Sequence, residues 1–403
     1  MIEKGLTNYF EKFLAKQPLF RNKKALQGNY TPEAINHRNT QIKMVADILA
    51  PVLRNEKPSN IFIYGKTGTG KTLCAKYICS NISHVAAQKE LPIKIVYLNC
   101  KLKKVADTEY RLIAQLAREF GKAIPPTGLP TDEVYNIFFN AIDNEKQTII
   151  LLLDEIDQLI NKIGDEILYN LTRINETLKK SQVCVVGISN NLIFTEHLDP
   201  RVKSSLSEEE ILFPPYNALQ IQNILRQRVK EAFHNEAIED GVIEKCAAYA
   251  AKEHGDARRA LELLRVAGEL AERESDNKVS MNHIDKADKK IEQDRIFDVL
   301  AAQPKQFQAT LYSILLISQK KKGQIFTGEI YEVYKRICQR TNLLSLTQRR
   351  VSDIIAEMDM LGLINAKVIS KGRYGRTREI TLSVPLSINP QIKKQLEEGL
   401  DLS

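Results

Sequence analysis

The sequence predicts an α/β protein in which a parallel sheet is followed by smaller domains. Between Ser59 and Ile211, the short apolar runs IFIY, IKIVYL, TIILLL and VCVVGI alternate with helix-like stretches, as in a parallel sheet covered by helices. The pair Pro214-Pro215 breaks this pattern, and the amphipathic segments after it indicate a small group of helices. A chain of 403 residues exceeds what one hydrophobic core normally holds, so we expect two or three domains.

The C-terminal part carries the pattern of a winged helix. Beyond Pro304, three helical patterns precede the alternating segment REITLSV, which itself follows the turn-rich stretch KGRYGRT. From Phe297 onward the chain holds 16 Lys and Arg residues against 10 Asp and Glu residues, out of a net charge of +8. This excess suits a polyanionic partner, although a solvated basic surface would give the same count. The predicted domains are a base at 1–213, a helical lid at 214–297 and a winged helix at 298–403.

Composition and short motifs exclude several classes of protein. With 43% hydrophobic and 27% charged residues, the chain does not have the composition of a disordered protein. Its longest apolar run, Ile149 to Leu153, is too short to cross a membrane, and the N-terminus lacks a secretory segment. The cysteines form no CxxC pair and the histidines no HExxH motif, so we expect buried thiols and no structural metal. These features predict a cytoplasmic protein without a membrane partner.

The segment GKTGTGKT has the composition and the context of a phosphate-binding loop. It follows the apolar strand IFIY and opens the helical pattern LCAKYICSNI, which is the order of elements that such a loop requires. Its glycines let backbone N–H groups point at phosphate oxygens, and the helix N-terminus adds the positive end of its dipole. The lysine before the final threonine is expected to bridge the outer phosphates. The loop consists of Gly65, Lys66, Thr67, Gly68, Thr69, Gly70, Lys71 and Thr72.

Two acidic residues follow the most apolar of the predicted strands. Asp154 and Glu155 come directly after TIILLL, where the carboxyl end of a parallel strand faces the phosphate loop. The Thr72 hydroxyl and the Asp154 carboxylate are the groups expected to hold Mg²⁺, and Glu155 can polarise an attacking water. A chance glycine-rich turn beside an unrelated acidic strand end would need two coincidences in the correct order. Nucleotide binding is therefore the strongest functional prediction.

Four further polar residues are candidates for the nucleotide site, and the first two have two interpretations each. Asn190, after the strand VCVVGIS, either orients water against the γ-phosphate or only begins a loop. Arg201, in LDPRVKSSL, either stabilises transferred phosphate charge, as across a subunit contact, or is a plain surface arginine. Arg258 and Arg259, in GDARRAL, lie at a helix start where cations oppose the dipole, which favours an anionic partner such as nucleotide.

In this order, the motifs GKTGTGKT, LLLDEID, GISNN, LDPRVKSSL and GDARRAL resemble those of AAA+ ATPases. The segments NHRNTQI and FPPY, together with the winged helix, make the chain more similar to archaeal relatives of the origin-recognition and cell-division-control replication initiators. The resemblance spans nearly all of the chain. It implies an AAA+ base, an α-helical lid and a C-terminal winged helix, with ATP or ADP and Mg²⁺ as cofactors.

The resemblance also implies roles for individual residues. Asn190 would be the first sensor, Arg201 the arginine finger and Arg258 the second sensor of the bound nucleotide. Asn191 departs from the family pattern, in which Asp follows the sensor asparagine, and this difference bears on hydrolysis rather than on binding. Four residues are implied to contact the nucleotide from outside the phosphate loop, with the first two near adenine: His37, Arg38, Tyr216 and Arg228.

Two parts of the chain are expected to contact DNA. Family members carry a helical insertion after the second strand that touches the minor groove, and residues 101–135 would form it here. In the winged helix, the pattern SLTQRRVSDIIAEMDMLGLI has one apolar face, formed by Val351, Ile354, Ile355, Met358 and Leu361. The residues expected to enter a major groove from this helix are Arg349, Arg350 and Ser352, and those of the basic wing tip are Lys371, Arg373, Tyr374 and Arg376.

Together these features predict an ATP-dependent DNA replication initiator that recognises origin DNA as a nucleotide-controlled switch. Hydrolysis by such a switch would be slow. Its expected partners are double-stranded origin DNA, other initiator protomers and the replicative helicase, which it would help to load at the nucleoid. Two alternatives remain open from the sequence: a hexameric branch-migration motor, which would show fast DNA-stimulated turnover, and a nucleotide-sensing regulator, which would occupy promoters only.

Overall fold

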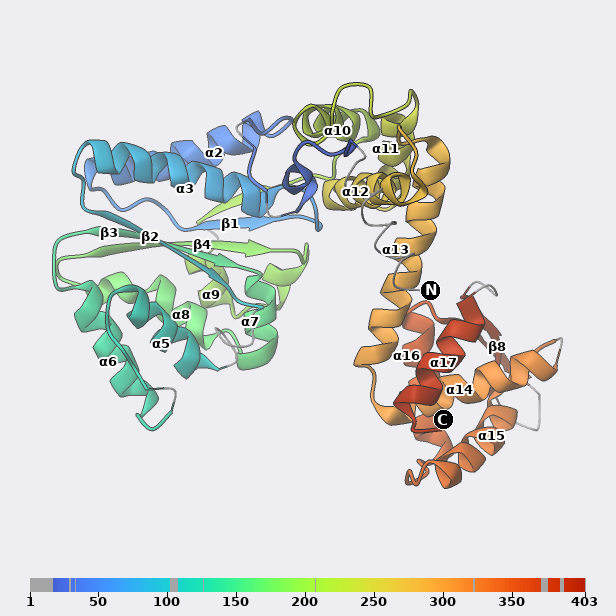
Figure 1. Ribbon diagram of the computed structural model, residues 1–403. Helices are drawn as coiled ribbons and strands as arrows, with labels where there is room; N and C mark the ends of the chain where they lie inside the picture. Colours follow the sequence, from blue (N-terminus) through green and yellow to red (C-terminus); the bar gives the residue numbers. More distant parts are fainter. Residues whose placement is uncertain are drawn as a thin grey trace, which may run out of the picture. The chain divides into compact units, whose positions relative to one another are not determined.

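The computed structural model describes residues 17–28, 30–32, 34–101, 108–125, 127–206, 208–321, 323–370, 376–384 and 388–402. The chain forms two compact units, Met1–Ile284 and Asp285–Ser403, and each is described by itself (Figure 1). The first unit contains the sheet and the lid, and the second contains the winged helix. Among the described residues, no helix combines the length and the apolar character needed to cross a membrane.

The first unit is built on a parallel sheet, as the sequence predicts. Its strands follow the order β2-β3-β4-β1-β5 within the described residues, and all pairs are parallel. The interior strand β3, between β2 and β4, is buried along its whole length because both faces of the sheet are covered by helices. The fifth strand was not anticipated, since its EEIL sequence lacks an apolar run. The strands are β1 (Ile61–Tyr64), β2 (Ile93–Asn99), β3 (Thr148–Asp154), β4 (Gln182–Ser189) and β5 (Glu209–Leu212).

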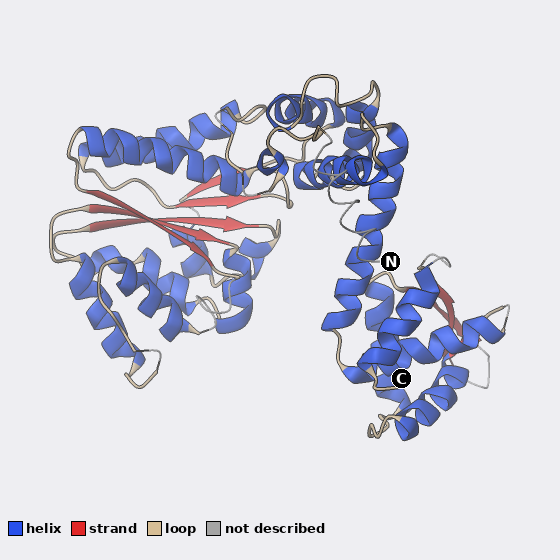
Figure 2. Ribbon diagram, in the orientation of Figure 1, coloured by secondary structure: helices blue, strands red, loops and turns tan. Residues whose placement is uncertain are grey.

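Helices cover both faces of this sheet (Figures 1 and 2). On one face lie α2 (Asn39–Leu49) and α3 (Lys71–Gln88), with the 3₁₀ helix η2 (Ala50–Arg54). The interval in which the sequence predicts an insertion holds α5 and the first residues of α6, and both helices contribute apolar side chains to the core on the opposite face. That face carries α5 (Glu109–Glu119), α6 (Thr131–Ile142), α7 (Ile156–Ile163), α8 (Glu166–Thr172), η3 (Ile174–Glu176), η4 (Phe194–His197) and α9 (Pro200–Leu206).

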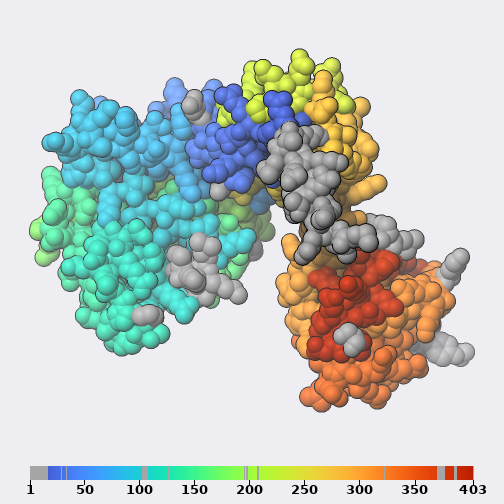
Figure 3. All heavy atoms as spheres, viewed as in Figure 1, coloured from blue at the N-terminus to red at the C-terminus, as the bar shows by residue number. Residues whose placement is uncertain are grey.

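The lid consists of α10 (Ala218–Ala232), α11 (Val242–Lys252) and α12 (Ala257–Glu274). The 3₁₀ helix η1 (Lys23–Leu26), in the part of the chain that the sequence analysis assigns to the base, lies against the lid. Phe20 pairs with Phe233 at the end of α10, with ring centroids 4.6 Å apart. Figure 3 shows these blue N-terminal residues beside the yellow-green lid. The segment around Phe20 and η1 therefore packs on the lid.

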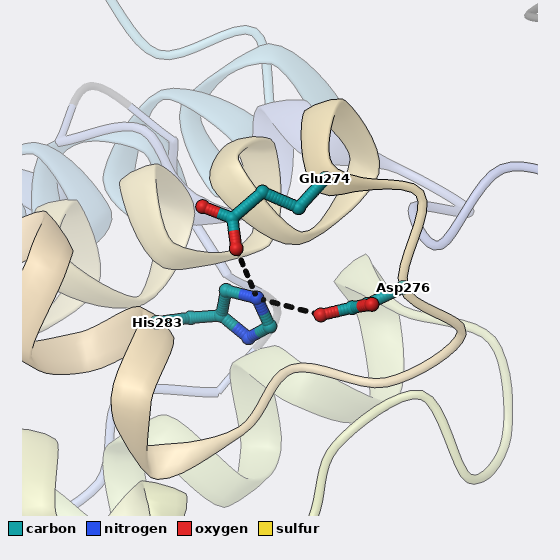
Figure 4. A group of neighbouring side chains, drawn as sticks. All are labelled: Glu274, Asp276 and His283. Atoms are coloured by element: carbon teal, nitrogen blue, oxygen red, sulfur yellow. Dashed lines mark ion pairs between the residues drawn. The ribbon is translucent and has the colours of Figure 1, made fainter.

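The turn from α12 into α13 (Met281–Ala302) is held by a buried histidine (Figure 4). The backbone N–H of Ser280 donates to Nδ1 of His283 at 3.0 Å, so the ring proton lies on Nε2. Nε2 then faces the carboxylates of Asp276 at 3.1 Å and Glu274 at 3.5 Å. A protonated Nε2 has no lone pair for a metal ion. The group formed by Glu274, Asp276 and His283 therefore holds the turn between α12 and α13 by hydrogen bonds.

The second unit has the winged-helix fold that the sequence predicts. Helix α13 runs through position 297, where the sequence places the domain boundary, and ends at Ala302. The wing pairs β7 with β8, and a short β6 completes an antiparallel sheet of order β6-β8-β7. A last helix, α17, was not predicted. The elements are α14 (Lys305–Lys320), β6 (Ile325–Phe326), α15 (Thr327–Arg340), α16 (Gln348–Met360), β7 (Ile364–Ser370), β8 (Arg376–Leu382) and α17 (Asn389–Gly399).

One predicted core position of the winged helix is wrong. Leu361 is 40% exposed, whereas Leu363 is buried at 2% exposure. Helix α16 ends because Gly362 takes a positive φ of 74°, and the N–H groups of Gly362 and Leu363 close on the carbonyls of Asp359 and Met358. This Schellman turn rotates the chain, so Leu363 and not Leu361 continues the apolar face. Val351, Ile355 and Met358 are buried as predicted.

Candidate functional site

The phosphate loop lies between β1 and α3, at the carboxyl edge of the sheet. Gly68 and Gly70 have φ values of 68° and 88°, in the left-handed region that favours glycine. The Thr69 hydroxyl donates to the Lys66 carbonyl at 2.9 Å and closes the loop on itself. Gly70 is the N-cap of α3 without a side chain of its own, which leaves the first N–H groups of the helix open to an anion.

Lys71 is the buried cation of this loop, with 4% of its surface exposed. Its ammonium donates to the carbonyls of Gly65 and Lys66 and to Oδ1 of Asn190, each at 2.8 Å. Burial, and next the positive charge of Arg258, lower the pKa of Lys71 from 10.5 to about 8. The loop thus holds a positive charge that an anionic ligand would stabilise.

The buried Asp154 carboxylate accepts hydrogen bonds from two hydroxyl groups beside the phosphate loop. Thr72 Oγ1 lies 3.0 Å from Asp154 Oδ2, and the Tyr97 hydroxyl donates to the same oxygen at 2.9 Å. Tyr97 reaches it because β2 and β3 pair in register up to Asn99 and Asp154. Burial, followed by the Asp154 charge, raises the pKa of Tyr97, so its hydroxyl remains a donor at neutral pH. The sequence analysis did not identify Tyr97, because the register between β2 and β3, which brings its hydroxyl to Asp154, cannot be read from the sequence.

Glu155 follows directly, and its backbone has a left-handed φ of 55°. It precedes α7 but its side chain makes no cap hydrogen bond, so the carboxylate is not engaged by the helix. Its nearest ion pair is with Lys101, whose Nζ lies 3.7 Å from Oε2. The Glu155 side chain has 21% exposure, so solvent can reach its carboxylate.

Asn190 lies in the loop after β4, within reach of the phosphate loop. Besides accepting from Lys71, it is held through its backbone N–H, 3.4 Å from Asp157 Oδ1, and Ser189 Oγ donates to the same carboxylate at 3.0 Å. Asn191, the departure from the family pattern, accepts the N–H of Ile193 at 3.0 Å through Oδ1. An aspartate at this position could accept the same bond.

Beside the phosphate loop, base, lid and N-terminal segment enclose a cavity of about 160 Å³. Arg228 lines it and is 5% exposed; its Nη1 has no hydrogen-bond partner among the described residues. Burial lowers the pKa of Arg228, and its guanidinium lies over the Tyr30 ring at 4.8 Å. A buried donor without a partner is suited to a polar ligand. Predicted residues that line the cavity are Gly68, Gly70, Thr72, Tyr216, Arg228 and Arg258, joined by the unpredicted Tyr30, Pro32, Ile35, Ile224 and Leu261.

His37 and Arg38 do not line this cavity. The buried Arg38 donates through Nε to the Thr69 carbonyl at 2.9 Å and through Nη2 to the Pro214 carbonyl at 2.6 Å. Its guanidinium also lies 3.8 Å from the centroid of the Tyr216 ring. Arg38 therefore links the phosphate loop to Pro214, which precedes the first helix of the lid. His37 is half-buried, with Nε2 at 3.4 Å from Nδ2 of Asn223.

Arg201 lies at the exposed start of α9, outside the cavity. Its side chain is 72% exposed, pairs with Asp199 at 3.0 Å and lies over the Tyr169 ring at 5.3 Å. The Asp199 pair raises the pKa of Arg201, and the guanidinium stays charged. Within its own chain this arginine is a surface residue held in a defined orientation.

The predicted DNA-contacting residues lie in the second unit. Arg349 and Arg350 are exposed in the first turn of α16, on the side away from the buried face. Ser352 is half-buried, and its carbonyl accepts from Arg378 Nη1 at 2.7 Å, which joins α16 to β8. Lys371, Arg373 and Tyr374 lie outside the described residues. Arg376 begins β8, but its side chain is likewise outside what the structure describes.

Three protein families match consecutive parts of the chain. The ATPase family associated with various cellular activities (AAA) matches residues 61–215. The Cdc6 AAA+ ATPase-type lid domain matches residues 222–289, and the CDC6, C terminal winged helix domain matches residues 298–388. With its complete phosphate loop, the AAA part is a nucleotide-binding domain.

Similar proteins cover almost the whole chain. The ORC1-type DNA replication protein of Pyrococcus horikoshii is 51% identical over 383 residues, which are 94% of this chain and 91% of the relative. The ORC1-type DNA replication protein 1 of Methanosarcina mazei is 52% identical over 384 residues, 95% and 92% of the two chains. The solved Aeropyrum pernix ORC1 protein in complex with DNA matches with a TM-score of 0.84 and 41% identity over 95% of this chain and 98% of that one. The chain therefore belongs to the family of ORC1-type DNA replication proteins.

Proposed function

We propose that this protein initiates DNA replication by binding origin DNA under the control of a bound nucleotide. One observation carries the proposal: a complete phosphate loop and a winged helix occur together in a chain 41% identical, over nearly its full length, to an ORC1 protein solved in complex with DNA. A nucleotide switch needs a ligand that contacts two movable parts. The cavity meets this requirement, because both the base and the lid line it.

ATP and ADP are the proposed nucleotides, with Mg²⁺ as the metal. The oxygens of Thr72 and Asp154 are hard ligands of the kind that Mg²⁺ prefers, and they already lie within 3.0 Å of each other. Lys71 and the N–H groups from Gly65 to Thr72 would hold the phosphates, and Arg228 would offer its free donor to the nucleotide. Tyr216 and Arg258 would contact it from the lid side, with His37 and Arg38 supporting the junction.

Hydrolysis is proposed to be slow and to reset the switch. Glu155 would accept a proton from the attacking water, and Asn190 would orient that water while holding Lys71. Arg258 would sense the γ-phosphate from the lid. The exposed and oriented Arg201 would act in a neighbouring protomer, because it lies outside the cavity of its own chain. Slow turnover would also separate this protein from a branch-migration motor.

The proposed domains are the base at 1–213, the lid at 214–297 and the winged helix at 298–403. The family matches at 61–215, 222–289 and 298–388 support this division. Residues 101–135 are proposed as the initiator insertion, so that the base and the winged helix both contact DNA at the nucleoid. Loading of the replicative helicase would follow from this placement on the origin.

DNA binding by α16 can be tested through its first turn. Replacing Arg349 and Arg350 together with alanine is expected to weaken duplex binding and to flatten its salt dependence. Each lost phosphate contact lowers the log–log salt slope by about 0.9, and each lost base contact costs about 1–3 kcal/mol. The measurement is fluorescence anisotropy with labelled duplex at several salt concentrations. The matched control replaces Lys393 and Lys394 on α17; equal losses in both variants would argue against α16 as the contact.

Nucleotide affinity is expected to fall as the pH rises above 8. Lys71 is charged below its pKa of about 8 and neutral above it, whereas bound phosphate favours the charged form. Binding at about pH 9 must therefore take up a proton, and the affinity should fall by at most about tenfold per pH unit. Calorimetry in two buffers of different ionisation enthalpy measures this uptake. Absence of proton uptake would contradict the assignment; in Lys71→Arg any remaining affinity should not depend on pH, because a guanidinium stays charged.

A further inference from the structure

The turn between α11 and α12 is in direct contact with the phosphate loop. The N–H of Ala257 donates to the Gly68 carbonyl at 3.3 Å. A Cβ added to Gly68 would lie 1.7 Å from Asp256 Oδ1, so the carboxylate rests on the bare Cα of this glycine. The lid and the phosphate loop therefore meet at Asp256. This residue has no role in the nucleotide binding and hydrolysis proposed for the site.

Asp256 is also the N-cap of α12. Its Oδ1 accepts from the backbone N–H groups of Arg258 at 2.8 Å and Arg259 at 3.3 Å. The N-termini of α3 and α12 therefore meet at the same place, and each can stabilise an anion. At α12 this anion is the protein's own carboxylate, while at α3 the N–H groups remain open.

Asp256 is close enough to the phosphate loop for its negative charge to act on Lys71. It is among the groups that raise the pKa of Lys71, as Asp154 and Asp157 do, whereas Arg258 lowers it. A triphosphate bound to Lys71 would carry up to about four negative charges within the same range. Asp256 and the phosphates would repel each other, and the extra γ-phosphate would add to the repulsion.

We propose that Asp256 is a fixed negative charge of the lid that limits nucleotide affinity, and that it opposes ATP more than ADP. The inference rests on the proposed nucleotide site and deepens it. The repulsion lets nucleotide leave a site that its many phosphate donors would otherwise hold tightly. At the same time, the cap bonds of Asp256 keep Arg258 at the start of α12, beside the cavity.

The test separates the charge of Asp256 from its cap bonds. Asp256→Asn removes the charge, while asparagine caps helices about as well as aspartate and has the same shape. This variant is expected to bind Mg-ATP about 3- to 10-fold more tightly than the unaltered protein, with a smaller gain for Mg-ADP, by titration calorimetry at low salt. The matched control is Glu253→Gln, which removes a 45% exposed carboxylate of the same turn that pairs with Arg259. The control should change either affinity by less than about twofold.

Salt provides a second measurement. The gain of Asp256→Asn should shrink at about 1 M NaCl, because added ions screen the repulsion. Unchanged or weaker ATP binding by Asp256→Asn, with an unchanged melting temperature, would overturn the inference. A gain that salt does not reduce would also overturn it, since it would come from altered packing. Failure of the nucleotide site itself would look different: the unaltered protein would then bind neither nucleotide.

Discussion

Replacing Lys71 with alanine is expected to abolish nucleotide binding, with a loss of affinity of at least about a hundredfold. The ammonium is nearly fully buried and makes its hydrogen bonds to two loop carbonyls and Asn190. Each charged hydrogen bond to phosphate contributes about 1.5–3 kcal/mol, and two of them account for this loss. Alanine would also leave the carbonyls of Gly65 and Lys66 facing the phosphates without a cation between them.

The measurement for Lys71→Ala is titration calorimetry with Mg-ATP and Mg-ADP. The control is Lys89→Ala, which removes the same charge at the exposed C-terminal end of α3. Affinity in the control should stay within about twofold, because a solvated charge a whole helix away is screened. Undiminished ATP affinity in Lys71→Ala, with the fold intact, would remove the phosphate-loop assignment.

Replacing Glu155 with glutamine is expected to keep nucleotide binding and to slow hydrolysis by about a hundred- to ten-thousandfold, the usual contribution of a general base. Glutamine has the same shape but cannot accept a proton. The Glu155 carboxylate makes no cap bond, is 21% exposed and lies 3.7 Å from Lys101 Nζ, so water can reach it and its loss should not disturb the fold.

Phosphate release under single-turnover conditions measures this effect, and calorimetry on the same sample measures binding. Glu166→Gln is the matched control, because Glu166 is an exposed carboxylate on α8, in the same part of the chain. Its hydrolysis rate should equal that of the unaltered protein. Equal rates in Glu155→Gln would assign the base to another residue.

Much of the candidate nucleotide site could be predicted because the residues of the phosphate loop are contiguous in the sequence. A phosphate loop needs glycines, a lysine and a hydroxyl in a fixed order, and no distant residue alters that need. The run TIILLL predicted a buried strand, and Asp154 after it lies beside Thr72 as expected. The wall of the cavity could not be predicted, because Tyr30 and Ile35 reach it through long-range packing of the N-terminal segment.

By itself the sequence determined the fold class, the domain types, the phosphate loop and the acidic strand end, since these depend on local periodicity and on motif order. Only the tertiary structure decided what Arg38 binds, how Gly362 ends α16, how His283 holds the α12–α13 turn and that Asp256 rests on Gly68. Each of these depends on backbone geometry, and several also on partners distant in the chain. The type of a side chain determines which groups it can bind, whereas the packing of the folded chain determines which of those groups lies next to it.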